Sequence, residues 1–384
     1  MKKKILLFGP IANFGGRELE TGFIAHSLSF KYEVDVCTTG FLTKESQLFH
    51  FDKNQKAFSL QDTLCDKYFS IKILSFLSYL KNCQEGGILS KYANNVIAKK
   101  YFGYDRKRIL TIKELVSKYD LVFICAQLSS NLVSEVVKFA KENKKKVVFR
   151  TTGAIKNPNY NFLEDVDLFI HHSNNNANKL LNLKNHNYRI IDQCAFNEYK
   201  LLNIPYVRNE VKSFLTIARL VKEKNIDIVI KAFKKSKKDG DKLYVIGDGI
   251  DLKNLIKVAG KDNDIIFTGF VSNNDLDFLF SKVDCVIISY FELETGPLTG
   301  IEAMASARLI ISSKTGAMEE RLTFSKYWFE NNVDELTKQI QKLKELDKNE
   351  VFDFSKKIRD RYEEEYSMDK ISRKYLEAVN KILY

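Results

Sequence analysis

The sequence predicts an α/β protein of two doubly wound domains, each a parallel sheet with helices on both faces. At 384 residues the chain is long for one hydrophobic core, because domains average ~150 residues. Short apolar runs alternate with helix-like segments of roughly 10 to 15 residues, which is typical of parallel sheets. This alternation restarts after the polar stretch 203–212. We therefore place a first domain at 1–205 and a second at 213–351.

The first domain opens with a predicted strand, turn, helix and strand. Ile5–Phe8 is an apolar run, Gly15 and Gly16 interrupt it, and 17–30 has helical periodicity. A second unit of the same kind follows, with strands at 120–126 and 145–153 around a helix. Shorter apolar runs at 167–173 and 188–193 complete the predicted sheet.

Residues 41–110 break this alternation and are predicted to form a helical insertion. They are rich in aromatic residues and end in the basic run YFGYDRKR. Two interpretations remain open. Aromatic stripes usually pack as core, so the insertion can cover the sheet edge. Alternatively, its aromatic and basic residues form a patch on the acceptor side or against lipid head groups.

The second domain repeats the strand and helix rhythm from Ser213 onwards. Strands are predicted at 213–218, 242–249, 264–270, 284–289 and 308–313, with helices between them. The tail, 352–384, carries apolar residues at helical spacing and is predicted to form one or two amphipathic helices. We expect these helices to pack back on the first domain.

Composition and charge limit the class of protein. The six cysteines are scattered, without CxxC pairs, and fit reduced buried thiols of a cytoplasmic protein. The apolar run at the start is broken by Gly9 and Pro10 and reads as a strand rather than a signal peptide. No apolar stretch reaches the ~18 to 20 residues of a spanning helix. The net charge of +12 permits a phosphorylated ligand or an anionic membrane surface, and no nucleic-acid motif accompanies it.

The segment from 284 to 305 carries the strongest candidate site. An apolar strand runs into a turn containing Gly296, Pro297 and Gly300, and a helix follows. In open α/β sheets, ligands bind beyond the carboxyl ends of strands, where free N–H groups at helix starts attract anions such as a diphosphate. Glu294 and Glu302 flank this turn, eight positions apart. Each carboxylate suits a pair of sugar hydroxyls.

These residues resemble a known family. Glu294, seven residues, Glu302 and then AMA resemble the E-x7-E signature of glycosyltransferase family 4, whose members are retaining enzymes of GT-B fold. TIARLVKEKNIDIVIKAF resembles the family's G-R-L-x-x-x-K-G segment and places Arg219 and Lys224 at its basic positions. LYVIGDGIDLKNL, and GPIANFGGRE near the start, resemble two further family segments. The matches cover most of the second domain and the first 40 residues.

The resemblance implies a role for each matched residue. Arg219 and Lys224 would neutralise the donor diphosphate and the charge on the leaving group. Glu302 would hold the ribose hydroxyls, and Glu294, also a catalytic candidate, those of the transferred sugar. Gly15 and Gly16 would bring bare backbone near the donor. The sequence contains no DxD motif at a strand end, so the donor is expected to bind without a metal or other cofactor.

Two positions depart from the family pattern. Many relatives have glycine where Pro297 stands, and since proline has no N–H, the donor amides must come from Gly296, Leu298 and Thr299. Relatives often carry a His after the strand that here ends at Arg150, whereas Thr151 and Thr152 follow in this chain. A His-assisted contact from the first domain is therefore in doubt.

The predicted function is retaining transfer of a sugar from a UDP- or GDP-sugar to an acceptor hydroxyl. The basic charge and the aromatic insertion favour a lipid-linked glycan of bacterial surface-polysaccharide assembly, with the enzyme in the cytoplasm or peripheral at the inner membrane face. A nucleotide-sugar epimerase of similar architecture is one alternative. A non-catalytic basic protein that binds membrane or nucleic acid is the other.

Overall fold

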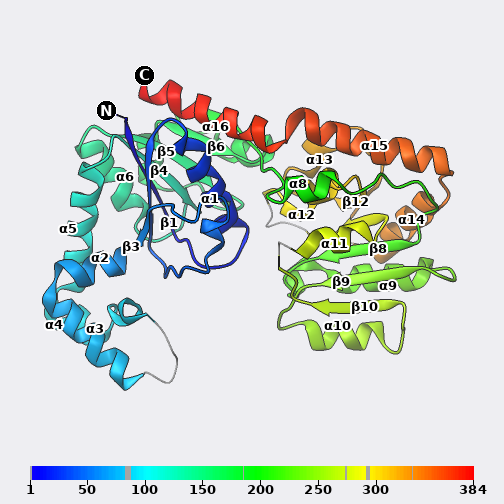
Figure 1. Ribbon diagram of the computed structural model, residues 1–384, viewed down its shortest axis with the longest axis horizontal. Coiled ribbons are helices and arrows are strands. Elements are labelled where there is room, and N and C mark those ends of the chain that lie inside the picture. Colours follow the sequence, from blue (N-terminus) through cyan, green and yellow to red (C-terminus); the bar gives the residue numbers. More distant parts are fainter. Residues whose placement is uncertain (1, 83–87, 185, 273–274, 291–294, 331) are drawn as a thin grey trace. The chain divides into compact units, whose positions relative to one another are not determined.

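The computed structural model describes residues 2–82, 88–184, 186–272, 275–290, 295–330 and 332–384. It divides into two compact units. The first unit comprises Met1–His171, Ala177–Ile191 and Ser372–Tyr384, and the second comprises His172–Asn176 and Asp192–Ile371. Among the described residues each unit contains one fully parallel sheet (Figure 1).

The sheet of the first unit has the strand order β3-β2-β1-β4-β5-β6-β7. Its strands are β1 (Lys4–Gly9), β2 (Glu33–Thr38), β3 (Ala57–Ser59), β4 (Leu121–Ala126), β5 (Lys146–Thr151), β6 (Leu168–His171) and β7 (Tyr188–Ile190). Every residue of the central strand β4 is buried, as expected where helices cover both faces of a parallel sheet. The predicted doubly wound fold is confirmed for this unit.

Helices of the first unit connect these strands. They are α1 (Gly16–Ser29), α2 (Leu60–Lys67), α3 (Phe69–Lys81), α4 (Val96–Phe102), α5 (Tyr104–Ser117) and α6 (Val133–Glu142). The short helix α7 (Asn174–Ala177) belongs to the second unit except for Ala177. Short 3-10 turns are η1 (Gln47–Phe49), η3 (Leu89–Tyr92), η4 (Asn161–Asp165) and η5 (Asn178–Leu180). Helices α2 to α5 form the predicted insertion. The segment is not wholly helical, because β3 within it pairs with β2 in parallel.

The second unit has the strand order β10-β9-β8-β11-β12-β13. Its strands are β8 (Ser213–Ile217), β9 (Lys242–Ile246), β10 (Ile265–Gly269), β11 (Cys285–Ile288), β12 (Leu309–Ser313) and β13 (Trp328–Phe329). Between β8 and β11 the strand order reverses direction along the chain, which is the switch point where open sheets bind ligands. The doubly wound prediction is confirmed here too.

The helices of the second unit follow the predicted rhythm. They are α8 (Glu198–Leu202), η6 (Lys222–Lys224), α9 (Ile226–Ser236), α10 (Leu252–Ala259), α11 (Leu276–Ser281), α12 (Leu298–Ala305), α13 (Met318–Arg321), α14 (Val333–Lys344) and α15 (Lys348–Glu365). Helix α9 shows why they form: Ile226, Val229, Ile230 and Phe233 recur at helical spacing and are all buried. Asp347 and Glu350 form a capping box at the start of α15.

The two tail helices lie in different units. Helix α15 packs against α12 and β12 within the second unit. Helix α16 (Met368–Leu383) joins the first unit from Ser372 onwards, where Tyr375 is buried and its ring lies 6.2 Å from that of Phe123 in β4. The second unit also begins earlier than the predicted boundary, at Asp192.

Among the described helices, none is both long and apolar enough to cross a membrane. The described cysteines Cys37, Cys65, Cys125, Cys194 and Cys285 are buried and form no disulfide.

Candidate functional site

Arg219 and Lys224 lie in the loop that leaves β8 at the switch point of the second sheet. Arg219 is exposed, whereas Lys224, at the end of η6, is half-buried. Burial and, to a smaller extent, the charge of Arg219 together lower the pKa of Lys224 to about 8. The structure therefore brings the two predicted basic residues together, at a place where a bound anion would relieve their repulsion.

The glycines that follow β9 hold this loop close to the sheet. A Cβ atom on Gly247 would lie 1.8 Å from the Ala218 carbonyl oxygen, and one on Gly249 would lie 2.1 Å from that of Leu220. The Leu220 amide donates to the Asp248 carbonyl at 2.8 Å. Gly247 also has a φ of 129°, which a larger residue rarely adopts. These glycines thus form a tight βα turn, and the turn fixes the backbone on either side of Arg219.

Tyr290, just beyond β11, connects the basic loop to helix α12. The Lys224 Nζ atom lies 4.1 Å from the centre of its ring, a cation–π contact. The Tyr290 hydroxyl donates to the Ile217 carbonyl oxygen at the end of β8. Neighbouring Ser289 donates from its hydroxyl to the Lys224 carbonyl oxygen at 2.7 Å. Burial raises the pKa of Tyr290, as does the charge of Glu302, so Lys224 and Glu302 both act on this one ring.

Glu302 lies inside α12 and is 3% exposed. Burial raises the pKa of its carboxyl to about 7, because a charge in a low-dielectric setting loses its hydration. Among the residues that the structure describes, none donates a hydrogen bond to this carboxylate. A buried acceptor without a donor is costly, and hydroxyl groups of a ligand would supply what it lacks.

The start of α12 is held by a buried arginine that the sequence did not single out. Arg321 is fully buried and forms two 2.7 Å bonds to the Asp192 carboxylate. Its third contact is a 2.6 Å bond to the carbonyl oxygen of Pro297, the residue before α12. A Cβ atom on Gly296 would lie 2.8 Å from Arg321 Nη2. Arg321 therefore fixes the turn that contains Gly296.

The remaining candidates of this turn are located as follows. Leu298 and Thr299 are the first residues of α12, where amides have no partner within the helix. Thr299 is 8% exposed. Glu294, predicted to face the transferred sugar, lies outside the described residues. Among the described residues no group of three or more His, Cys, Asp or Glu side chains is placed to hold a metal ion.

Gly15 and Gly16 belong to the first unit, at the start of α1. Gly15 caps the helix with a φ of 145°, and its amide donates to Gln47 Oε1 at 2.7 Å. A Cβ atom there would lie 2.6 Å from a carboxylate oxygen of Glu18. Around Gly16 a Cβ atom would meet no atom within 4 Å. Gly15 is thus required by the turn itself, whereas Gly16 faces open space.

The threonines that stand in place of a family histidine are in the first unit. Thr151 is buried, and its hydroxyl lies 2.9 Å from Nδ1 of the fully buried His171. Thr152 follows the strand, and its amide donates to the Ala126 carbonyl at 3.0 Å. His171 and His172 are both buried, as expected for structural polar residues.

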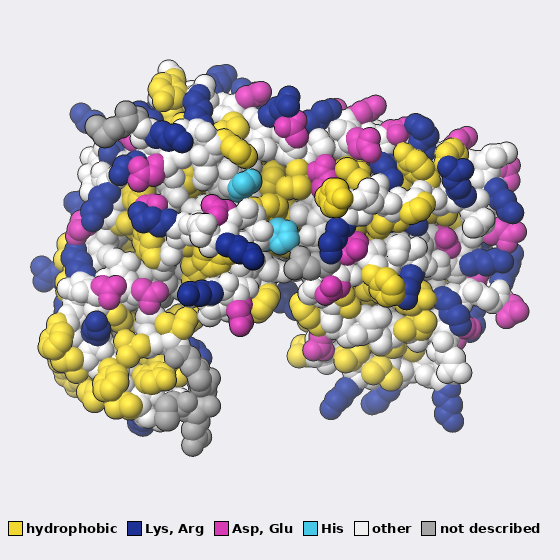
Figure 2. Space-filling view, in the orientation of Figure 1, with side chains coloured by type: hydrophobic (Ala, Val, Ile, Leu, Met, Phe, Trp, Pro, Cys, Tyr) yellow, Lys and Arg dark blue, Asp and Glu magenta, His cyan; other side chains and the backbone are white. Residues whose placement is uncertain are grey.

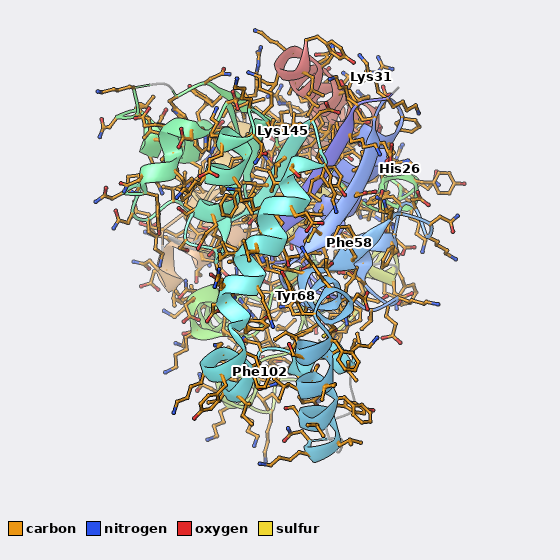
Figure 3. The ribbon with its side chains drawn as sticks, turned by 90° about the vertical axis from the view of Figure 1, so that its left-hand side faces the viewer. His26, Lys31, Phe58, Tyr68, Phe102 and Lys145 are labelled. Atoms are coloured by element: carbon orange, nitrogen blue, oxygen red, sulfur yellow. The ribbon has the colours of Figure 1, made fainter. Side chains whose placement is uncertain are left out.

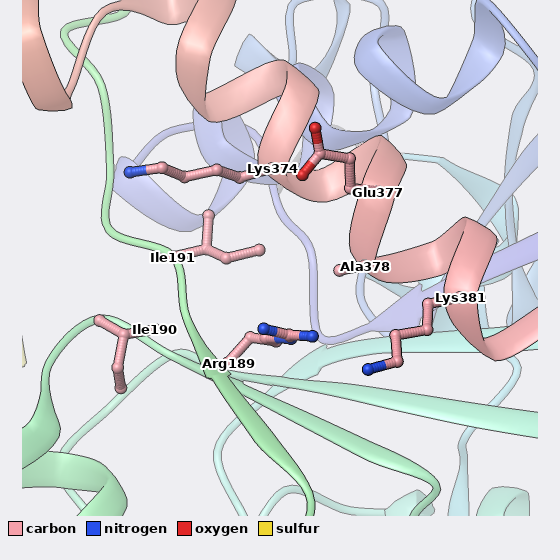
Figure 4. A pocket seen from close by; sticks show the side chains of 7 residues that line it. All are labelled: Arg189, Ile190, Ile191, Lys374, Glu377, Ala378 and Lys381. Atoms are coloured by element: carbon pink, nitrogen blue, oxygen red, sulfur yellow. The ribbon is translucent and has the colours of Figure 1, made fainter.

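The first unit also contains a pocket of about 410 Å³ between β7 and α16 (Figure 4). It is lined by Arg189, Ile190, Ile191, Lys374, Glu377, Ala378 and Lys381. Figure 4 shows Arg189 and Lys381 directed toward one another from the two elements. None of the predicted site residues lines this pocket.

Comparison with known proteins relates the second unit to one family. Residues 204–361 match the model of the glycosyl transferases group 1. Alpha-monoglucosyldiacylglycerol synthase of Streptococcus pneumoniae is 32% identical over 126 residues, 30% of this chain and 28% of that protein. A glycosyltransferase of Methanocaldococcus jannaschii is 29% identical over 118 residues, 30% of each chain. The matched part thus spans less than a third of either relative.

Solved structures match over nearly the whole chain. HepE of Anabaena, in complex with UDP-glucose, has a TM-score of 0.71 at 13% identity and covers 99% of this chain and 100% of its own. A glycosyltransferase from Rickettsia africae has a TM-score of 0.72 at 19% identity, covering 100% and 99%. The fold is therefore GT-B, and fold and matched segment together support a glycosyltransferase. The segment that matches the glycosyl transferases group 1 model, 204–361, lies within the second unit.

Proposed function

We propose that this chain is a retaining glycosyltransferase that moves a sugar from a UDP- or GDP-sugar to an acceptor hydroxyl. The observation that carries the proposal is the arrangement around Tyr290. Lys224 Nζ lies 4.1 Å from the centre of the Tyr290 ring, and the charge of buried Glu302 acts on the same side chain. The cationic loop suits the phosphates of a nucleoside diphosphate. The Glu302 carboxylate, which receives no hydrogen bond from the described residues, suits the hydroxyls of its ribose.

In this proposal each residue of the second unit has one task. Arg219 and Lys224 neutralise the diphosphate and the charge that develops on it when the sugar leaves. Glu302 accepts hydrogen bonds from the ribose hydroxyls. The amides of Gly296, Leu298 and Thr299 add donors at the positive end of α12. Glu294 holds the hydroxyls of the transferred sugar, and Gly15 and Gly16 of the first unit allow close approach of backbone to the donor.

The resemblance to the retaining family implies a transfer step without a protein nucleophile. The bond between the anomeric carbon and the diphosphate oxygen breaks, and its electron pair stays on the diphosphate. The acceptor oxygen attacks from the same face, so the anomeric configuration is retained. The acceptor proton passes to the departing phosphate oxygen. Arg219 and Lys224 stabilise this step because they lie where the negative charge grows, and no metal is required by the scheme.

The proposed acceptor is a lipid-linked glycan of surface-polysaccharide assembly. Two features support it. The chain carries a net charge of +12, which favours anionic lipid-linked substrates. The relative from Streptococcus pneumoniae is named as the synthase of a glucosylated diacylglycerol.

A thermal-shift panel of UDP-, GDP- and ADP-sugars tests the donor assignment. We expect one nucleotide class to raise the melting temperature of the wild type, and Glu302→Ala and Arg219→Ala to abolish the shift. Lys253→Ala, an exposed lysine on α10, is the matched control and should keep it. If no nucleotide stabilises the wild type, the proposal fails. With an acceptor in hand, NMR of the product's anomeric proton tests retention.

The comparisons favour neither alternative over a glycosyltransferase. An epimerase would exchange isotope into the nucleotide-sugar without any acceptor, whereas a transferase needs one. A non-catalytic basic protein would bind polyanions with steep salt dependence and would show no nucleotide-sugar affinity.

A further inference from the structure

The helical insertion of the first unit exposes apolar side chains to an unusual degree. Among the described residues, 21 large hydrophobic side chains are exposed, and 11 of them lie between Phe69 and Leu110. On α3 the exposed fractions are 76% for Phe69, 47% for Phe76 and 56% for Leu77. On α4 Val96 is 78% exposed. Scattered exposed apolar residues are ordinary, but a concentration of them marks an interaction surface.

The exposed residues of α3 form one stripe along the helix. At about 100° per residue, Phe69, Ile73, Phe76, Leu77 and Leu80 fall within an arc of about 100°. The buried residues Ile71 and Ser75 fall on the opposite side, where the Ser75 hydroxyl donates to the Leu89 carbonyl oxygen. The inward side of the helix also carries apolar residues, Ile71 and Leu74, which join the core of the first unit. The outward stripe is therefore a second apolar side that the described residues leave exposed.

Lysines stand at both edges of this stripe. By the same helical geometry, Lys72 and Lys81 lie about 40° beyond its two margins, and both are exposed. On α4 the exposed Lys99 and Lys100 accompany Val96, Ile97 and Tyr101. Among the described residues no carboxylate lies within ion-pair distance of Lys72, Lys81, Lys99 or Lys100. Long lysine stems can lie along an apolar phase while the ammonium group reaches phosphate.

The surface also differs in charge from the rest of the chain. Residues 69–110 hold eight Lys or Arg and two acidic residues, a net charge of +6 against +12 for all 384 residues. Helix α3 packs against α2, η3 and α4, and Figure 1 shows α3 and α4 extending away from the sheet of the first unit. Figure 2 shows hydrophobic side chains gathered over these helices.

Figures 1 and 3 place this surface at the opposite end of the first unit from the pocket of Figure 4. Phe102, at the end of α4, lies at one end of Figure 3, and Lys31 lies at the other. Lys31 donates to Asn380 of α16, the helix that lines the pocket. The basic pocket and the apolar surface are thus separate features.

We propose that the exposed face of α3 and α4 docks this protein on an anionic phospholipid bilayer. The stripe of α3 enters the boundary between head groups and acyl chains, and the flanking lysines contact lipid phosphates. Charge complementarity selects this occupant. A second copy of the chain would bring two surfaces of like charge together, and a nucleic acid offers no apolar phase for Phe69, Phe76 or Val96. The inference does not depend on the proposed donor site, whose charged residues lie in the other unit.

Vesicle sedimentation of the full chain tests this surface. We expect the wild type to bind phosphatidylglycerol–phosphatidylcholine vesicles and to bind pure phosphatidylcholine weakly. Phe76→Ser/Leu77→Ser/Leu80→Ser should weaken binding at least about tenfold, because moving even one large apolar side chain fully from water into lipid contributes roughly that factor. Its matched control is Leu181→Ser/Ile256→Ser/Phe278→Ser, whose original residues are 58%, 47% and 59% exposed. This control should bind as the wild type does.

Charge reversal tests the lysines separately. Lys72→Glu/Lys99→Glu/Lys100→Glu should lose most of the preference for phosphatidylglycerol. Lys253→Glu/Lys257→Glu/Lys261→Glu changes the net charge equally at exposed lysines of the second unit and should retain it. Salt at about 0.5 M should weaken wild-type binding, since exposed charges are screened at that strength.

Three results would overturn the proposal. They are failure of the wild type to sediment with phosphatidylglycerol vesicles, wild-type binding by the triple serine variant, and a wild-type dimer that this variant converts to monomer. The nucleotide thermal shift is measured on the same samples. If the triple serine variant keeps the nucleotide-induced thermal shift but no longer binds vesicles, it is folded. Such a result would separate the two sites. A wild type that binds vesicles but no nucleotide would sink the proposed function and leave this surface standing.

Discussion

The two units depart from the ordinary pattern of burial in opposite ways. Around α12 the second unit buries charge: Arg321 is 0% exposed, Asp192 is 6% exposed and Glu302 is 3% exposed. On α3 the first unit exposes apolar side chains, with Phe69 at 76%. Both arrangements are unfavourable in water, the first through lost hydration and the second through exposed hydrocarbon. The Asp192–Arg321 pair compensates its own charges within the protein, whereas the Glu302 carboxylate and the α3 stripe would each need a partner. In our proposals these partners are a ligand with hydroxyl groups and a lipid surface.

The comparison predicts that buried charges of the second unit differ in their effect on stability. The charges of Asp192 and Arg321 compensate one another, whereas no described residue donates a hydrogen bond to the Glu302 carboxylate.

The single tryptophan, Trp328, lies in β13 of the second unit. Its fluorescence therefore reports the unfolding of that unit alone.

The largest effect is expected for Arg321→Met. The substitution leaves the Asp192 carboxylate buried without its cation, which typically costs about 3–5 kcal/mol. Urea unfolding followed by Trp328 fluorescence should show that loss. The double variant Asp192→Asn/Arg321→Met removes the stranded charge and should recover part of it. A loss below about 1 kcal/mol in the single variant would mean that the pair does not hold the α12 turn.

Glu302→Gln is expected to stabilise the ligand-free protein above neutral pH. The carboxyl titrates near 4.5 when unfolded and at about 7 when folded, so the folded state binds more protons between these values. Stability therefore falls as the pH rises from about 4.5 to about 7 and then levels off. The full difference is roughly 3 kcal/mol at most.

The measurement is the pH dependence of Trp328-monitored unfolding for both proteins. The free energy of unfolding of the glutamine variant should depend less on pH than that of the wild type. The higher stability of the variant should disappear below about pH 4.5. It should also lose the nucleotide-induced thermal shift. Equal pH profiles for the two proteins would contradict the raised pKa of Glu302.

A smaller effect is expected from Lys224 on nucleotide affinity. Its pKa is lowered to about 8 in the ligand-free protein, and a bound diphosphate favours the protonated form. Affinity for UDP should thus fall as the pH rises above about 8, by up to about tenfold per pH unit until the pKa of the complex is reached. Calorimetric titrations at several pH values measure it. In Lys224→Gln this dependence should disappear, and its persistence would assign the titration to another group.

The smallest effect is expected where the first unit exposes its apolar stripe. Phe76→Ser, Leu77→Ser and Leu80→Ser should each change stability by no more than about 0.5 kcal/mol, because surface substitutions rarely do more. Ile71→Ser on the buried side of the same helix should cost about 2–4 kcal/mol. Scanning calorimetry of the first unit's transition distinguishes them. A large loss from the exposed substitutions would mean that the stripe packs against the protein.

Local sequence pattern was enough to predict both sheets. The apolar runs at 121–126 and 285–288 are fully buried strands, and the glycine turns separate them from helices as expected. Strand β3 was missed, because Ala57–Ser59 is too short for alternation to show. Arg219 and Lys224 were predicted from the resemblance to a family segment, and Glu302 from the turn and helix that follow an apolar strand. The structure brings the basic pair together and buries Glu302.

Two features of the molecule could not be predicted from local pattern. Asp192 and Arg321 are separated by 129 positions, and only the folded chain pairs them. In a lysine-rich sequence nothing distinguishes Arg321 from a surface cation. The stripe on α3 has the same spacing whether it faces the core or water. Of the two interpretations of the insertion, packing of its aromatic residues as core does not hold for Phe69, Phe76, Tyr101 and Phe102, which are all exposed.

The late residues of the first unit constrain how the chain folds as it is made. Tyr375 is 1% exposed beside Phe123, and its ring lies 5.9 Å from the Arg150 guanidinium. These partners are synthesised more than 200 residues before Tyr375. On the ribosome, the first unit must wait with part of its core uncovered until the second unit has been translated. An exposed core during translation invites chaperone binding, and ribosome-bound chains halted before Ser372 should be more sensitive to protease in the first unit than released chains.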